Sequence, residues 1–409
     1  MINLKYVNGG ITAAKGFTAA GIHAGIRKNS DKKDLALLFS SQPAKVGGVF
    51  TQNLYAAAPV AYCKQVVNHG TASALVVNSG YANAVTGEQG TADTLTMASE
   101  VAHVLNIAPD QVLVCSTGVI GVKLPMAVIK PGIKTIATKL SPSGGNDAAQ
   151  AIMTTDTVTK EVAVEITLSD GRVATIGGMA KGSGMIHPNM ATLLCFITTD
   201  LPISSSALQT AIKYAADRSF NMVTVDGDTS TNDTMLIMAN GLIGGTMIEK
   251  NSADLQLFTE ALTMISINLA KKMAADGEGA NHLLEIEVVN AFSREDAARA
   301  AKAVASSNLV KTAFFGADAN WGRIICAVGY AGITLPENKT DITISSEGGS
   351  ITVMQDGAGL VFDEILAKKI LSVKDIKVFI NLKCGAFSAT AWGCDLSYEY
   401  VRINGDYRT

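Results

Sequence analysis

The chain has 409 residues, of which 48% are hydrophobic and 17% charged, and its formal net charge is −3. This composition predicts a folded protein with a substantial core rather than a disordered chain. The mildly acidic balance argues against a nucleic-acid-binding surface, and no apolar run is long enough to span a bilayer. The segment Met1–Phe17 lacks a basic region followed by an apolar stretch, so we predict no secretory signal and a cytoplasmic location.

The first part of the chain alternates strand-like and helix-like segments. We predict a strand at Ala72–Val77, an amphipathic helix at Asp93–Leu105 and a second strand at Val112–Cys115. Ser116, Thr117 and Gly118 follow that second strand. A junction of strand and loop can direct a hydroxyl and a backbone N–H at one point, although such a tripeptide is more often an ordinary turn.

The amino-acid composition changes at Thr192, from loop-like before it to apolar after it. A predicted helix at Ala148–Met153 leads into a polar cluster, and the segment that begins at Gly177 is rich in Gly, Met, Pro and Asn, which is typical of a loop. The apolar run Leu193–Ile197 then predicts a buried strand. A threonine where a loop enters a core strand is suited to be a nucleophile.

A threonine hydroxyl is a weak nucleophile and needs a base, which its own α-amino group supplies if the chain cuts itself. In that reaction the Thr192 hydroxyl attacks the Ala191 carbonyl, the acyl group moves from nitrogen to oxygen, and water releases the ester. Local composition by itself favours the simpler interpretation that Thr192 only begins a strand.

Two helices and a polar loop follow. We predict helices at Ser205–Arg218 and Ala253–Ala275, with a polar loop at Asp226–Asp233 that lacks the spacing of a calcium-binding EF-hand. Glu278 comes just after the second helix, where a carboxylate is unfavourable for the helix dipole. Such a position suits a carboxylate that is held for ligand binding.

From His282 the pattern restarts, which predicts a separate C-terminal unit with a boundary near residue 280. The expected elements are a strand to Val289, helices at Arg294–Val304 and after Trp321, and strands at Ile342–Ser345, Ile351–Met354 and Leu396–Ile403. Arg323 is as consistent with an exposed helix position as with a carboxylate partner.

The cysteines and histidines show no disulfide framework and no metal-ligand spacing. Cys115, Cys195 and Cys326 lie among apolar or small residues, where cysteine commonly acts as a small hydrophobe. We therefore predict neither a structural nor a catalytic metal.

Several sequence blocks, in order along almost the whole chain, resemble the ornithine acetyltransferases, which also act as glutamate N-acetyltransferases in arginine biosynthesis. The blocks are VNSGYANAVTG (77–87), CSTGVIG (115–121), MTTDT (153–157), KGSGMIHPNMATLL (181–194), DGDTSTNDT (226–234), DGEGA (276–280), GADANWGRI (316–324) and INGDYRT (403–409). Tyr81 and Val85 depart from the family pattern, where Asn and Cys are expected.

The resemblance implies a mixed α/β fold, an αββα sandwich of the aminopeptidase and ornithine acetyltransferase type with a smaller C-terminal α/β domain. We expect a catalytic domain at residues 1–280 and a C-terminal domain at residues 281–409. Self-cleavage would give an α chain of residues 1–191 and a β chain of residues 192–409, and we expect two copies of each in an α2β2 assembly.

The resemblance also assigns roles to individual residues. Thr192 is the nucleophile, with the cleavage site between Ala191 and Thr192, and Thr117 and Gly118 form the oxyanion hole. The substrate-binding residues are Thr155, Lys181, Thr192, Glu278, Asn404 and Thr409.

The implied reaction moves the acetyl group of N2-acetyl-L-ornithine to L-glutamate through an acetyl-Thr192 intermediate, without a bound cofactor. Whether acetyl-CoA is a second acetyl donor stays open. Two alternatives also stay open: a self-cleaving aminopeptidase or amidohydrolase of related fold, and a ligand-binding protein without enzymatic activity.

Overall fold

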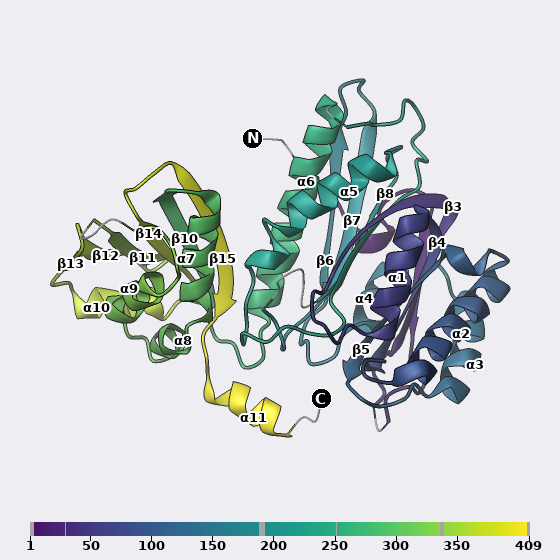
Figure 1. The fold of residues 1–409 in the computed structure, drawn as a ribbon, viewed down its shortest axis with the longest axis horizontal. Helices are drawn as coiled ribbons and strands as arrows, with labels where there is room; N and C mark the ends of the chain where they lie inside the picture. Colours follow the sequence, from purple (N-terminus) through teal and green to yellow (C-terminus); the bar gives the residue numbers. More distant parts are fainter. Residues whose placement is uncertain (1–3, 29, 188–192, 251, 336–338, 407–409) are drawn as a thin grey trace.

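A computed structural model describes residues 4–28, 30–187, 193–250, 252–335 and 339–406. Within these residues the strands form two separate sheets, each covered by helices (Figure 1). The larger sheet contains β1 (Lys5–Tyr6), β2 (Phe17–Ile22), β3 (Leu35–Phe50), β4 (Thr71–Tyr81), β5 (Val112–Val119), β6 (Lys160–Thr167), β7 (Val173–Lys181), β8 (Leu194–Thr199) and β9 (Thr234–Ala239). The helices of this part are α1 (Ala58–His69), α2 (Gly87–Leu105), α3 (Met126–Ala137), α4 (Gly145–Ala151), α5 (Ser205–Ala216) and α6 (Ala253–Ala275), with 3₁₀ turns η1 (Gly10–Thr12), η2 (Pro109–Gln111) and η3 (Phe220–Met222).

The long strand β3 joins the two halves of this sheet. Its first half pairs with β2 and β4, and Lys45–Phe50 pairs with β9. The register against β4 shifts between Phe39 and Ala44, and an irregularity of this kind lets a strand bend. One half of the sheet is therefore β2-β3-β4-β5, and the other continues from β9 through β8, β7 and β6 to β1.

The two halves pack face to face, as the alternation of side chains along their strands shows. In β8, Leu194 and Phe196 belong to an apolar cluster shared with strands of the other half. Cys195 and Ile197 instead pack in a cluster with α5 and α6. Because successive side chains of a strand point to opposite faces, β8 lies between the other half-sheet and these helices.

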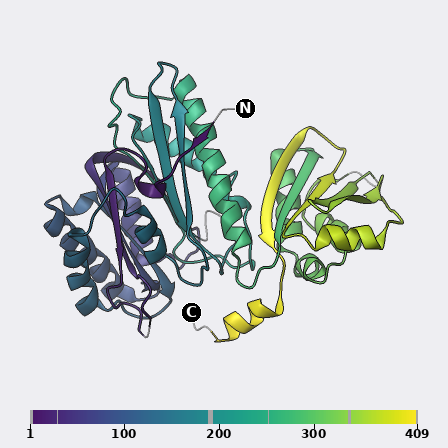
Figure 2. The same ribbon diagram turned by 180° about the vertical axis from the view of Figure 1, so that it is seen from behind.

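The other half-sheet shows the same arrangement. Leu75 and Val77 of β4 lie in the cluster between the halves, whereas Ala74 and Val76 pack with α2 and α3. Figures 1 and 2 show the two helix pairs on opposite sides of the strands. The predicted αββα sandwich is therefore confirmed.

The smaller sheet has the order β13-β12-β11-β14-β10-β15 among the described residues. Its elements are β10 (Leu283–Ala291), α7 (Arg294–Ser306), α8 (Asn308–Phe315), α9 (Trp321–Gly329), β11 (Asp341–Ser346), β12 (Gly349–Gln355), β13 (Ala358–Gly359), α10 (Glu364–Leu371), β14 (Asp375–Asn381), β15 (Phe387–Cys394) and α11 (Tyr398–Asp406). The expected boundary near residue 280 lies between α6 and β10.

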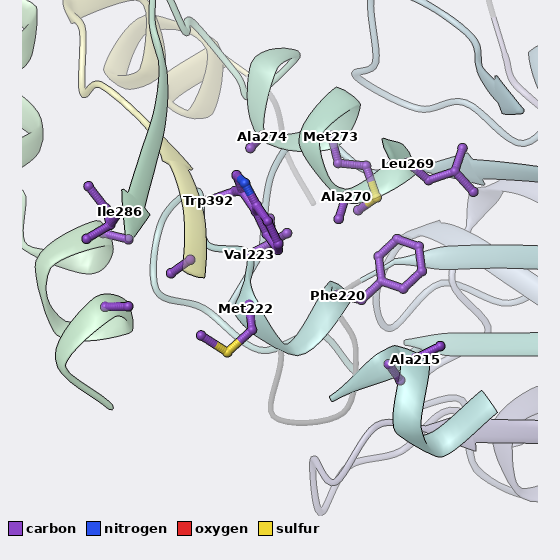
Figure 3. Packing of buried hydrophobic residues seen from close by; sticks show 14 of the residues in the cluster. Ala215, Phe220, Met222, Val223, Leu269, Ala270, Met273, Ala274, Ile286 and Trp392 are labelled. Carbon is purple, nitrogen blue, oxygen red and sulfur yellow. The ribbon is translucent and has the colours of Figure 1, made fainter. Parts of the chain in front are cut away.

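An apolar contact connects the two sheets. Trp392 of β15 forms a backbone bridge with Val223, and it packs beside Met273 of α6 and the segment that contains Phe220 (Figure 3). The same cluster of buried residues continues into both units. The C-terminal unit is thus held against the larger one by a shared core.

The structure corrects three predicted segments. Leu396–Ile403 is not a strand: β15 ends at Cys394, and α11 lies outside the smaller sheet in both views (Figures 1 and 2). The ion pair of Glu399 and Arg402, three positions apart, is one that a helix supports. No residue of α11 is buried, so the apolar residues that suggested a strand do not enter a core.

The other two corrections concern segments that were expected to be loops. Gly177–Lys181 belongs to β7, paired on both sides with β6 and β8. A Cβ on Gly177 would lie 2.1 Å from the carbonyl oxygen of Gly10, which explains glycine in a strand. Ser116–Gly118 likewise lies within β5, which continues to Val119.

Cysteine burial was predicted partly wrongly. Cys115 and Cys195 are buried, as expected for small hydrophobes, but Cys326 is exposed on α9. Its apolar neighbours Ile324 and Ala327 face the core instead.

No helix of the described residues is long and apolar enough to cross a membrane.

Phe196 tests the packing between the two half-sheets, because its side chain is fully buried there. Phe196→Ala removes a large apolar group and leaves a cavity, so the free energy of unfolding should fall by about 3–5 kcal/mol. Thermal denaturation should show a clearly lower midpoint. Phe292→Ala is the matched control, since Phe292 is 64% exposed; equal effects of the two substitutions would contradict the layer assignment.

Candidate active site

A pocket of about 240 Å³ brings together predicted site residues from distant parts of the chain. Its wall includes residues of β5, β7, β8 and α11, and residues of the segments that follow α4 and α6. The predicted site residues that line it are Thr117, Gly118, Thr155, Lys181, Glu278 and Asn404. Thr192, Ala191 and Thr409 lie outside the described residues. Leu193 and Leu194, which follow Thr192 in sequence, also line the pocket.

Gly118 is a position where only glycine fits. Its φ is +132°, and a Cβ there would lie 2.2 Å from the carbonyl carbon of Gly80 on β4. Gly80 and Gly118 are partners in the parallel pairing of the two strands. This close approach places Thr117 and Gly118 together at the pocket, at the end of a strand of the sheet.

Asn232 fixes this strand end from the opposite side, and it was not among the predicted site residues. Its Nδ2 donates to the carbonyl oxygens of Ala82 and Ser116, at 2.6 and 2.8 Å. The side chain is buried, so these hydrogen bonds are shielded from water. Its place in the DGDTSTNDT block was the only sequence signal for it.

Lys181 is the last residue of β7 and lies opposite Leu194 of β8. Its ammonium group is buried and donates a hydrogen bond to Thr117 Oγ1 at 3.2 Å. Burial lowers the pKa of Lys181, while the negative charges of Asp156, Asp233 and Glu278 raise it in part. The solvent exposure that is usual for a lysine outside helices does not apply here.

A buried ion-pair network supports the wall that carries Thr155. Lys160 is fully buried and donates to Asp156 Oδ1 at 2.7 Å and to Asp276 Oδ2 at 2.5 Å. Asp156 also accepts the backbone N–H groups of Thr154 and Gly182, at 3.0 and 2.7 Å. Sequence patterns did not predict this network, because its members come from three separate segments.

Glu278 follows α6, as predicted, and enters the pocket against a glycine. Its backbone N–H donates to the carbonyl of Ser183 at 2.9 Å. Its Oε2 accepts a hydrogen bond from Asn404 Nδ2 of α11 at 2.8 Å. A Cβ on Gly184 would lie 2.3 Å from this carboxylate, so the glycine makes room for it.

The segment that precedes the expected cleavage site is held by Asp226. This carboxylate accepts the backbone N–H groups of Met185 and Ile186, at 2.6 and 2.8 Å. Met185 has a φ of +55°, a conformation that costs energy for a residue other than glycine. The predicted polar loop therefore shapes the chain at Met185 and Ile186, and it also lines the pocket.

The part of the chain that the structure describes contains no group of three or more His, Cys, Asp and Glu side chains arranged to hold a metal ion. The pocket offers hydrogen-bond donors, one buried ammonium group and several carboxylates, which suits a small polar substrate with charges of both signs.

The Asp156 carboxyl makes the site sensitive to acid. Burial raises its pKa, but the charges of Lys160 and Lys181 and its hydrogen bonds outweigh burial and lower it to about 2. Relative to an ordinary value of 3.8, this contributes about 2 kcal/mol of stability. The contribution is fully present above the unfolded pKa and is lost as the pH falls through the folded pKa.

Asp156→Asn should therefore lower the melting temperature at pH 7 and weaken its fall between about pH 4 and pH 2. Thermal denaturation at a series of pH values measures both effects. The exposed Asp31 provides a control, since Asp31→Asn should leave the profile unchanged. A variant as stable as the wild type at pH 7 would contradict the assigned role of the ion-pair network.

Comparison with known proteins shows the family of this chain. The ArgJ family model matches residues 18–409. The arginine biosynthesis bifunctional proteins ArgJ of Caldanaerobacter subterraneus subsp. tengcongensis and Symbiobacterium thermophilum are each 50% identical to this chain, over 99% of it and 100% of their own length. The crystal structure of ArgJ from Bacillus halodurans is 43% identical with a TM-score of 0.50, and covers 53% of this chain and 100% of that one. The chain belongs to the ArgJ family.

Proposed function

We propose that this chain is a glutamate N-acetyltransferase of arginine biosynthesis, which transfers the acetyl group of N2-acetyl-L-ornithine to L-glutamate. The observation that carries the proposal is the single pocket that collects Thr117, Gly118, Lys181, Glu278 and Asn404. Membership of the ArgJ family supports the same reaction. We also infer that acetyl-CoA is a second acetyl donor, as the word bifunctional in the names of the relatives suggests.

The reaction proceeds in two half-reactions at Thr192. The Thr192 hydroxyl attacks the acetyl carbonyl carbon, its proton passes to the α-amino group directly or through water, and the amide C–N bond breaks as ornithine leaves with that proton. The amine of glutamate then attacks the acetyl ester, and the Thr192 hydroxyl is restored. No bound cofactor takes part.

Thr117 and Gly118 stabilise the oxyanion of each tetrahedral intermediate. Thr117 Oγ1 accepts a hydrogen bond from Lys181, so its own hydroxyl hydrogen is free to donate toward the pocket. Because the pocket wall is largely buried, such a donor acts more strongly than it would in water. The buried Lys181 ammonium group adds a fixed positive charge beside the oxyanion.

Cleavage between Ala191 and Thr192 supplies the α-amino base. β8 holds Leu194 on one side, and Asp226 holds Met185 and Ile186 on the other. The scissile segment is thus anchored at both ends. The whole Bacillus halodurans chain covers 53% of this one, which is the share that residues 192–409 make up, and this agrees with a separate β chain.

The remaining parts of the proposal rest on the family. The substrate contacts are those of Thr155, Lys181, Thr192, Glu278, Asn404 and Thr409, and the mature enzyme is an α2β2 assembly in the cytoplasm. Neither nucleic acid nor membrane takes part. The substrate site is completed by both domains, the catalytic domain of residues 1–280 and the C-terminal domain of residues 281–409, since α11 contributes Asn404.

Self-cleavage is tested by the mass of the denatured chains. Wild-type protein should give two chains that join between Ala191 and Thr192, whereas Thr192→Ala should stay intact because it lacks the attacking hydroxyl. The control is Thr210→Ala at an exposed position of α5, which should be cut like the wild type. An intact wild-type chain would remove the α-amino base from the mechanism.

The oxyanion role predicts a loss of turnover in Thr117→Ala. With acetylornithine as donor and glutamate as acceptor, kcat should fall by about 10²–10³, with little change in KM, since the lost donor acts mainly in the transition state. Thr117→Ser keeps the hydroxyl and should retain most of the activity. Omitting glutamate from the wild-type assay separates transfer from hydrolysis, because a hydrolase would release acetate at the same rate.

A further inference from the structure

The charges that line the pocket are unevenly distributed. The one ammonium group among the described lining residues is that of Lys181, and the carboxylates are those of Asp226, Asp228, Asp233 and Glu278. Such a pocket attracts a cationic group and repels an additional anion. A carboxylate that has no hydrogen-bond partner within the protein can bind a cationic group of a substrate.

Asp226 and Glu278 already have partners within the protein. Asp226 accepts two backbone N–H groups of the segment before the cleavage site. Glu278 accepts the amide of Asn404 and packs against Gly184. Asp233 is 2% exposed and lies within the pocket wall. The carboxylates of Asp226 and Glu278 therefore hold parts of the pocket wall in place, and that of Asp233 is buried in the wall.

Asp228 differs from these three carboxylates in its exposure to solvent and in its contacts. It is exposed, and its side chain makes no hydrogen bond or ion pair with any part of the chain that the structure describes. Its backbone N–H donates to Asp226 Oδ1 at 3.2 Å, which fixes the position of the residue at the pocket wall. The Asp228 carboxylate is therefore held at the pocket without a hydrogen-bond or ion-pair partner among the described residues.

Tyr400 of α11 indicates where this carboxylate acts. Tyr400 lines the pocket beside Asn404. Asp228, Glu278 and Asn404 line the same pocket as this phenol, so Asp228 acts on the space that the proposed function gives to the substrate. In agreement with this placement, burial raises the pKa of the Tyr400 phenol, and the charges of Asp226, Glu278 and Asp228 raise it further.

The two substrates of the proposed reaction differ most in the charge of their side chains. In N2-acetylornithine the α-nitrogen is acylated and neutral, so the side-chain ammonium group carries the positive charge. Glutamate and the product N-acetylglutamate carry a carboxylate at their side-chain end. Both half-reactions use one pocket, so a free carboxylate there affects donor and acceptor in opposite directions.

We propose that Asp228 is a specificity-determining residue, whose carboxylate attracts the side-chain ammonium group of the donor and repels the side-chain carboxylate of the acceptor and product. This inference rests on the proposed function and adds a residue to it. The repulsion helps N-acetylglutamate to leave, and the attraction favours acetylornithine as the molecule that loads the enzyme.

The test is the effect of Asp228→Asn on kcat/KM for each substrate. In a two-step transfer, kcat/KM for acetylornithine reports only the first half-reaction, and kcat/KM for glutamate only the second. We expect about a fivefold decrease for acetylornithine, as for an exposed ion pair, together with an unchanged or increased value for glutamate. Asp228→Glu keeps the charge and should restore the wild-type preference.

The control is Asp110→Asn, since Asp110 is exposed on η2, outside the pocket lining; it should change neither value. A fall of both values in Asp228→Asn would mean that the substitution disturbs the loop, and unchanged values would mean that the carboxylate does not act on the substrate. Either result overturns the inference. A wild-type enzyme that fails to transfer acetyl from acetylornithine would instead refute the proposed function.

Discussion

The strand β3 is the constraint on which the rest of the structure depends. With 16 residues it is long enough to pair with β4 at one end and β9 at the other. A register shift between Phe39 and Ala44 lies within the β4 pairing, just before the β9 pairing begins at Lys45. A bend at this irregularity lets one continuous set of hydrogen bonds form two packed layers. The end of β5 and the ends of β7 and β8 therefore reach the same pocket from different layers.

Buried charge is the second recurring feature, and it is concentrated around this pocket. Burying an ion is costly unless it is paired and hydrogen-bonded. Lys160 meets that condition through Asp156 and Asp276. Lys181 meets it only in part, since it donates to the hydroxyl of Thr117 and has carboxylates nearby. The difference distinguishes a lysine that holds the wall from one that faces the pocket.

The C-terminal unit contributes to the site as well as to the core. Trp392 joins its sheet to the segment at Val223, and α11 carries Tyr400 and Asn404 to the pocket. A helix without buried residues, such as α11, needs specific contacts to keep its place. Here the hydrogen bond between Asn404 and Glu278 fixes α11 at the pocket wall, so both units are required for one site.

The sequence by itself determined the fold class and the family, because these depend on local periodicity and on specific blocks such as residues 181–194. It also singled out Thr117, Gly118, Thr155, Lys181, Glu278 and Asn404, which the structure brings to one pocket. It also determined α6 to the residue, since strong helical spacing and a polar end mark both limits. Only the tertiary structure decided that the last segment is the helix α11, that Asn232 fixes the strand ends and that Lys160 lies between two carboxylates. Those features arise from contacts between distant segments, and local periodicity carries no information about which distant side chains will meet.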